Sequence, residues 1–195
     1  SRIASALAVH NVMAEQYPEL LEKLTQGLFL KRTDEDGRRA TRTFSKDRVP
    51  FFYEEIGEIT CYLPTGYARL AEKSNQVPFS AQESEALYRV RKVAASPELY
   101  LDMGFKEGDI QFLNNRMMVH GRTDYQDSPE LENRRHLLRL WFEVPTWPAM
   151  PEAQIFHTAE DRALWSQYRQ PMNELPSIHY QKLFRIGLIK SYILS

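Results

Sequence analysis

The spacing of hydrophobic positions changes along this chain, and helical patterns alternate with short extended runs. Apolar residues recur at helical spacing over residues 3–16. They do so again behind the helix-capping sequence Ser80-Ala81-Gln82-Glu83, to about Ala95. Pro18 interrupts the first helix and opens a second, short one that ends before Gly27. These patterns predict three helices.

Short extended runs separated by turn residues predict strands in much of the remaining chain. Asp36-Gly37 lies between two such runs and Ile56-Gly57 between two more, so two hairpins are expected there. Several short strands with a few helices predict an α+β or mainly β fold. The other expected strands are 99–103, 110–113, 117–121 and 136–144, and the other expected helical stretches are 67–73, 159–169 and 178–193.

Composition and charge exclude some kinds of partner. The chain has 195 residues, and its 25 Lys and Arg against 26 Asp and Glu give a formal net charge of -1, which supplies no overall field to attract nucleic acid or an anionic membrane. No apolar run approaches the roughly 18 residues of a membrane span. The single cysteine, Cys61, permits no internal disulfide and no thiolate zinc cluster. We therefore expect a cytoplasmic protein with no nucleic-acid and no membrane partner.

Residues 108–143 hold the strongest candidates for chemistry. His120 ends an apolar run and is followed by Gly121, and Arg135 and Arg139 lie four residues apart on the next expected strand. An even separation places both arginines on one face of that strand. A buried guanidinium needs an anionic partner, which is either a bound carboxylate ligand or a carboxylate of the protein, whereas a solvent-facing strand needs neither. The residues alone leave these alternatives open.

Taken together, the motifs of this segment resemble those of the TauD/TfdA family, the taurine catabolism-type dioxygenases that depend on Fe(II) and 2-oxoglutarate. The resemblance covers most of the chain, and the order and spacing of its motifs make it quite specific. The stretches that carry it are Ser1-Arg2-Ile3-Ala4-Ser5-Ala6, Pro50-Phe51-Phe52, the helix after Ser80, Gly108-Asp109-Ile110-Gln111-Phe112-Leu113-Asn114-Asn115, His120-Gly121-Arg122-Thr123 and Arg135-His136-Leu137-Leu138-Arg139-Leu140-Trp141.

The resemblance implies a double-stranded β-helix, or jelly roll, with iron held by two histidines and one carboxylate and with 2-oxoglutarate and O2 at the remaining positions. His120 matches the distal histidine ligand of the family, and Arg135 matches the arginine that pairs with the far carboxylate of 2-oxoglutarate. Arg139 matches a second arginine, which in some members holds an anionic group of the substrate. The implied reaction hydroxylates a small organic substrate and releases succinate and CO2.

The chain departs from the family pattern at the iron ligands. The family's other two ligands form an H-x-D pair upstream of the segment that matches Ser1, yet no H-x-D or H-x-E occurs in these 195 residues. We therefore expect the C-terminal portion of a longer enzyme, inactive by itself. The main alternative is a catalytically silent jelly-roll binding or scaffold module, and a weaker one is an unrelated cupin-like enzyme.

The expected domain is one TauD/TfdA-like unit over residues 1–195, with an incomplete jelly roll and flanking helices. Residues 171–195 are apolar enough to form a helical extension that packs on the domain or on a second subunit, so the oligomeric state stays open. Because an incomplete jelly roll leaves sheet edges and apolar surface uncovered, we expect the isolated chain to be prone to aggregation.

Overall fold

The computed structural model describes residues 1–33, 42–55, 57–121, 126, 128–130, 144–161 and 163, and it has a mixed α+β architecture. This confirms the α+β class, and the described part of the chain contains no closed β-helix. In chain order the elements are β1 (Arg2–Ser5), α1 (Ala6–Gln16), α2 (Pro18–Gln26), β2 (Phe52–Glu55), β3 (Glu58–Cys61), α4 (Thr65–Lys73), α5 (Ala81–Ala94), β4 (Tyr100–Asp102), β5 (Met118–Gly121) and the 3-10 turn η2 (Glu152–Gln154).

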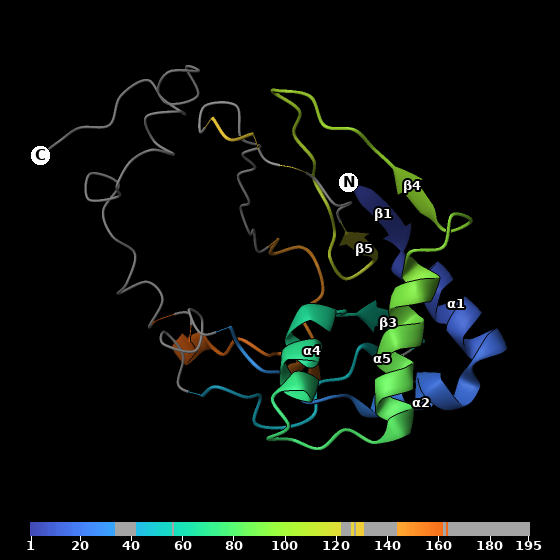
Figure 1. Cartoon of the computed structure of the whole chain (residues 1–195), viewed down its shortest axis with the longest axis vertical. Helices are drawn as coiled ribbons and strands as arrows, with labels where there is room; N and C mark the ends of the chain where they lie inside the picture. The colour runs from blue at the N-terminus through green and yellow to red at the C-terminus, as the bar shows by residue number, and fades with distance from the viewer. Residues whose placement is uncertain are drawn as a thin grey trace, which may run out of the picture.

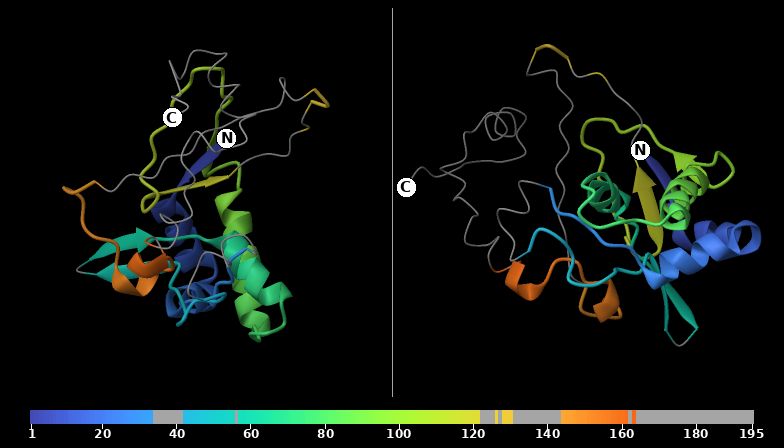
Figure 2. Two further views of the ribbon diagram at one scale, coloured as in Figure 1. Left: turned by 90° about the vertical axis from the view of Figure 1, so that its left-hand side faces the viewer. Right: turned by 60° about the horizontal axis from the view of Figure 1, so that its bottom comes forward.

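Two small antiparallel sheets lie beside a layer of helices (Figure 1). The first sheet has the strand order β4-β1-β5, so the N-terminal strand β1 lies between two strands from the middle of the chain. In its register Ile3 faces Leu101 on one side and His120 on the other. The second sheet is the hairpin β2-β3, in which Phe52 pairs with Cys61. Helices α1, α2, α4 and α5 form the layer on one side of the molecule (Figures 1 and 2).

The helices begin and end largely where local sequence signals place them. The capping box of α5 is present, because the Ser80 hydroxyl accepts a hydrogen bond from the Glu83 amide at 3.2 Å and the Glu83 carboxylate accepts one from the Ser80 amide at 2.7 Å. Gly27 ends α2 with φ of 87°, and a side chain there would come within 2.6 Å of the Val49 backbone. The expected helix at 67–73 is the body of α4.

The expected helix over residues 3–16 is wrong in its first turn. Residues Arg2–Ser5 form β1, which pairs with strands on both sides, and α1 begins only at Ala6. The Ser5 hydroxyl accepts a hydrogen bond from the Ala8 amide at 3.3 Å, so Ser5 is the N-cap. The apolar spacing of Ile3 fits a helix and a strand equally well, and pairing with distant strands decides between them.

The two hairpins and the later strands have mixed outcomes. The expected hairpin around Gly57 is confirmed as β2-β3, and the strands at 99–103 and 117–121 are confirmed as β4 and β5. In the first expected hairpin the flanking runs meet at a Lys31–Phe44 bridge, but its Asp36-Gly37 turn lies outside the described residues.

The expected strand at 110–113 is wrong, because these residues adopt no regular structure. Ile110 and Phe112 have 79% and 81% of their surface exposed, so no neighbouring element among the described residues covers them. A run of apolar residues predicts a strand only where another strand or a core is present to receive it. Most of residues 136–144, most of 159–169, and all of 171–195 fall outside the described residues.

The core lies between the helices and the hairpin β2-β3. Val9 and Met13 of α1, Leu24 of α2 and Val90 of α5 are fully buried there, together with Phe51 just before β2. Each helix contributes the apolar face that its sequence spacing predicts. Among the described residues, no helix is both long enough and apolar enough to cross a lipid bilayer.

Candidate functional site

His120 lies near the end of β5, on the exposed side of the strand. Val119 packs against the core and His120 is exposed, as the alternation of side chains along a strand requires. The partner of His120 in the register is Ile3 of β1. The two-strand pairing therefore fixes the backbone of His120 and presents its ring on the face of the sheet away from the core.

A turn immediately before β5 holds this strand in place. The Asn114 carbonyl accepts hydrogen bonds from the amides of Met117 and Met118 at 3.0 and 2.9 Å, and the Asn114 side chain accepts one from the Arg116 amide at 3.1 Å. The Arg116 carbonyl accepts the Cys61 amide of β3 at 3.0 Å. This turn thus connects the strand of His120 to the hairpin β2-β3.

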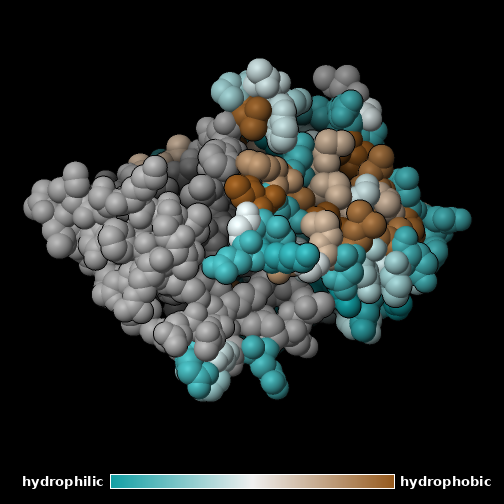
Figure 3. Space-filling view, turned by 90° about the horizontal axis from the view of Figure 1, so that it is seen from above, coloured by the Kyte–Doolittle hydropathy of each residue, from teal (hydrophilic) through white to brown (hydrophobic). Residues whose placement is uncertain are grey.

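Large apolar side chains are exposed in residues 100–121, the segment that contains this strand. Leu101, Ile110, Phe112 and Met117 each expose more than 60% of their surface. Figure 3 shows apolar side chains gathered on the face of the molecule that is seen from above. Soluble proteins rarely leave such groups uncovered on a contiguous face unless a ligand or further polypeptide meets them.

The predicted cosubstrate and substrate arginines are not placed by the structure. Arg135 and Arg139 lie outside the described residues, as do Arg122 and Trp141 of the same motifs. Of the three predicted site residues, the structure therefore places His120 alone. Its position relative to the two arginines stays a prediction from the sequence.

A ferrous centre of the expected kind needs two histidines and a carboxylate on one side of the metal. Among the described residues there is no group of three or more His, Cys, Asp or Glu side chains close enough to hold a metal ion. His120 is a suitable single donor, but the described residues alone do not make an iron site. The sequence of 195 residues contains no H-x-D or H-x-E.

Cys61 offers no nucleophile near this strand. Its side chain is buried at the end of β3, and burial raises the pKa of the thiol far above the ordinary range of cysteine. The neighbouring Tyr62 also has a raised pKa, first because it is buried and second because of the nearby Tyr67. Burial therefore disfavours the thiolate form of Cys61, the form that acts as a nucleophile.

The sequence reasoning missed a buried polar cluster away from β5. Arg32 and Asp161, 129 residues apart, form an ion pair of 2.7 Å with only 3% and 0% of their side chains exposed. Two signals were available in the sequence: a charged residue at the end of the apolar run before Thr33, and a Thr158-x-x-Asp161 spacing typical of a helix start. Neither signal indicates that the two residues meet.

Comparison with known proteins defines the class of this chain as a dioxygenase-type domain. A family model described as "Taurine catabolism dioxygenase TauD, TfdA family" matches residues 1–141. The chain belongs to this family. The matched residues include His120, Arg135 and Arg139 and end before the segment that carries Asp161.

Two curated proteins are similar to this chain. The chain is 27% identical over 163 residues to FR-33289 synthase of Streptomyces rubellomurinus, an alignment that covers 80% of this chain and 46% of the relative. It is 32% identical over 145 residues to the taurine hydroxylase-like protein SAT17 of Stachybotrys chartarum, which covers 71% of this chain and 34% of the relative. The chain thus spans less than half the length of these relatives.

Proposed function

We propose that this chain supplies the C-terminal part of the active site of an Fe(II)- and 2-oxoglutarate-dependent oxygenase. The observation that carries the proposal is the family match over residues 1–141, which includes the histidine and both arginines in order. The position of His120 on the exposed face of β5 supports it, because a metal ligand must be accessible to the metal and its cosubstrates. The reaction would hydroxylate a small organic substrate and release succinate and CO2.

The three candidate residues have distinct roles in this proposal. His120 would coordinate iron through one ring nitrogen, as the distal histidine ligand. Iron, when bound, would supply the activation of O2. Arg135 would bind the far carboxylate of 2-oxoglutarate through two parallel hydrogen bonds, the geometry that a planar guanidinium favours. Arg139, on the same face of the expected strand, would hold an anionic group of the substrate.

The substrate class follows from Arg139 and from the name of one relative. The relative from Stachybotrys is named as taurine hydroxylase-like, and taurine carries a sulfonate, an anion that a guanidinium binds well. We propose a small organic anion as substrate. The candidate site residues give no reason to add a nucleic-acid or membrane partner, and the oligomeric state is left open.

The proposed fold is a jelly roll of which this chain holds a part, in one domain over residues 1–195 with a helical extension at 171–195. Segments outside this sequence would supply the other two iron ligands and further strands. The chain by itself is then inactive, because a lone imidazole binds Fe(II) weakly. The alternative is a catalytically silent jelly-roll binding or scaffold module.

Succinate formation from 2-oxoglutarate with added Fe(II) tests the proposal. The chain alone should form none, whereas a version extended at its N-terminus by the H-x-D-bearing segment of a family member should form succinate. His120→Gln in the extended version should abolish the activity, while His10→Gln, a change of a partly exposed histidine on α1, should leave it intact. Activity in the short chain, or an inactive extended version that is folded, would favour another function.

A further inference from the structure

The sheet β4-β1-β5 carries His120 in a row with two apolar side chains. Residues that are directly opposite one another in antiparallel strands project to the same face of the sheet. Ile3 of β1 is opposite Leu101 of β4 on one side and opposite His120 of β5 on the other. Leu101, Ile3 and His120, here called the His120 row, therefore lie side by side on one face.

The next row of the sheet faces the other way and belongs to the core. Ala4 is 3% exposed, and its register partners Tyr100 and Val119 pack against the same core cluster. Ile3 is 7% exposed as well, yet among the described residues it lies outside that cluster. The alternation of side chains along β1 thus turns Ile3 away from the core and toward the face of the His120 row.

The acidic residue of the sheet also lies on the opposite face from His120. Asp102 is the only Asp or Glu in β1, β4 and β5, and it pairs with Arg2 at 3.4 Å. The guanidinium of Arg2 lies 4.4 Å from the centre of the Tyr100 ring, which places the pair on the face of Tyr100. These three strands therefore place no carboxylate beside His120.

The neighbours that the sheet gives His120 are hydrocarbon groups. Met118, two residues before His120 on β5, projects to the same face of the strand. Ile3 is directly across from the histidine, and Leu101 follows beyond it with 68% of its surface exposed. The face of the sheet around the histidine is therefore apolar.

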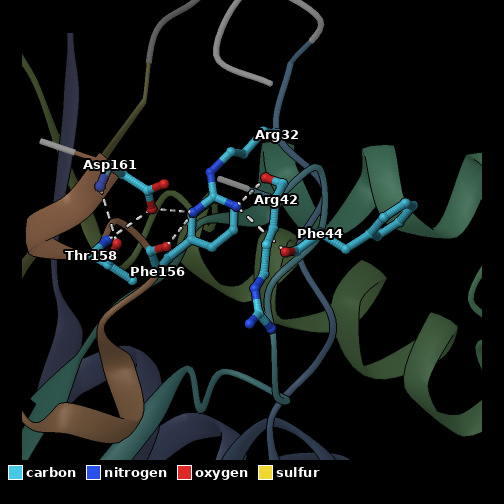
Figure 4. Close-up of polar contacts among 6 residues, drawn as sticks. All are labelled: Arg32, Arg42, Phe44, Phe156, Thr158 and Asp161. Carbon is cyan, nitrogen blue, oxygen red and sulfur yellow. Dashed lines mark hydrogen bonds and ion pairs between the residues drawn. The ribbon is translucent and has the colours of Figure 1, made fainter. Parts of the chain in front are cut away.

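The buried Arg32–Asp161 pair, by contrast, has its terminal groups occupied by the protein (Figure 4). Nη1 of Arg32 donates to the carbonyls of Arg42 and Phe44 at 2.7 and 3.4 Å, and Nη2 donates to the Phe156 carbonyl and to Oδ2 of Asp161, both at 2.7 Å. Four acceptors match the four terminal N–H bonds of a guanidinium. A ligand there would have to displace protein acceptors, whereas the apolar face of the sheet requires no such exchange.

We propose that Ile3 and Leu101 form an apolar wall beside His120, and that Leu101 is a specificity-determining residue that favours an aliphatic portion of the substrate. The specificity role rests on the proposed function, since it takes His120 as the iron ligand. Hydroxylation takes place at a carbon–hydrogen bond, so the reacting part of the substrate is hydrocarbon, and apolar side chains hold it while excluding water. Two strand spacings separate Leu101 from His120 by about 10 Å, which suits a substrate of a few carbon atoms. The substrate class is then a small organic anion with an aliphatic segment.

The wall itself is tested without metal, on the chain and on its N-terminally extended version. In nuclear Overhauser spectra, the Ile3 methyl groups should show cross-peaks both to the Leu101 methyl groups and to the side-chain protons of His120. The expected separation of directly opposite Cβ atoms is about 4.5–5.5 Å, which is short enough for such contacts. The Ala4 methyl group, on the other face, is the internal control and should contact Val119 instead.

The specificity role is tested on the N-terminally extended protein with Fe(II) and 2-oxoglutarate bound in the absence of O2. Calorimetric titration compares 1-propanesulfonate with taurine, two sulfonates of equal length that end in a methyl and an ammonium group. The unaltered protein should bind 1-propanesulfonate more tightly. Leu101→Asp should shift the ratio of the two Kd values at least about tenfold toward taurine, because a carboxylate attracts the ammonium and disfavours the methyl group. The matched control, Ile110→Asp, changes a residue that is 79% exposed and lies outside the sheet, and it should leave the ratio unchanged.

Each outcome bears on a different part of the inference. Missing Ile3 cross-peaks overturn the wall and leave the proposed function standing. An unchanged ratio in Leu101→Asp, or binding of neither sulfonate by the loaded protein, overturns the specificity role. An extended protein that binds no Fe(II) and 2-oxoglutarate counts against the proposed function and overturns the specificity role with it, while the cross-peaks still decide the wall. If Leu101→Asp does not fold, Leu101→Ala takes its place, and it should weaken the binding of 1-propanesulfonate and leave that of taurine unchanged.

Discussion

The helical layer and the region that carries His120 differ in how completely their apolar side chains are buried. The helical layer, α1, α2, α4 and α5, closes around a shared core in which Val9, Met13 and Leu24 are fully buried. The His120 region, residues 100–121, contains the short strands β4 and β5, which lie one on each side of β1, and it exposes large apolar side chains. The comparison indicates that the buried core of the described residues lies mainly with the helical layer, whereas the His120 region leaves large apolar side chains uncovered.

The largest expected difference between the two regions comes from deleting one aromatic ring in each. Phe51 is fully buried, so Phe51→Ala removes packed surface, leaves a cavity and should cost about 3–5 kcal/mol of unfolding free energy. Phe112 is 81% exposed, and Phe112→Ala should change stability by less than about 0.5 kcal/mol. Urea unfolding followed by circular dichroism measures both. Similar losses in the two variants would show that the His120 region already has a core of its own.

An intermediate effect is expected at the start of α5. Ser80→Ala removes the hydroxyl that accepts the Glu83 amide, and loss of an N-cap typically costs about 1 kcal/mol. Ser84→Ala, one turn into the same helix, is the matched control and should be close to neutral. A loss of the same size in both variants would assign the effect to side-chain volume, not to capping.

The smallest effect is a pH dependence of stability at Glu83. Burial opposes ionisation of this carboxyl, but hydrogen bonds from the Ser80 amide, Arg48 and the Ser80 hydroxyl outweigh it and hold its pKa below the usual 4.5. Because the pKa is lower in the folded than in the unfolded state, its contribution is complete above pH 4.5 and is lost as the pH falls through the folded value.

The acid limb of stability gives the corresponding measurement. Glu83→Gln should flatten the loss of stability below pH 4.5 relative to the unaltered chain, and Glu85→Gln, on the exposed face of α5, should not. An unchanged acid limb in Glu83→Gln would mean that Glu83 carries no net stabilisation from its partners.

The sequence predicts most of the helical layer because its signals are local. The capping box at Ser80, the proline at 18 and Gly27 fix helix ends through neighbouring residues alone. The errors fall where distant contacts decide: Ile3 is in a strand because β4 and β5 flank it, and residues 110–113 form no strand because no partner covers them.

The candidate site differs from the helices, because it is the motif resemblance that indicates His120, Arg135 and Arg139, and not any local structural signal. The structure places the first of them at the exposed face of β5, and the roles of all three stay predictions. The buried Arg32–Asp161 pair lay beyond any sequence pattern, since its two residues come from segments 129 positions apart. Long-range ion pairs of this kind follow from the packing of the whole chain.

The central claim is that His120 and Arg135 serve one site in a complete oxygenase. An anaerobic crystal structure of the N-terminally extended protein with Fe(II) and 2-oxoglutarate tests it most directly. We predict a bond from a ring nitrogen of His120 to iron and a two-pronged contact from the Arg135 guanidinium to the far carboxylate of 2-oxoglutarate. Iron held without His120, or Arg135 paired with a carboxylate of the protein, would contradict the claim.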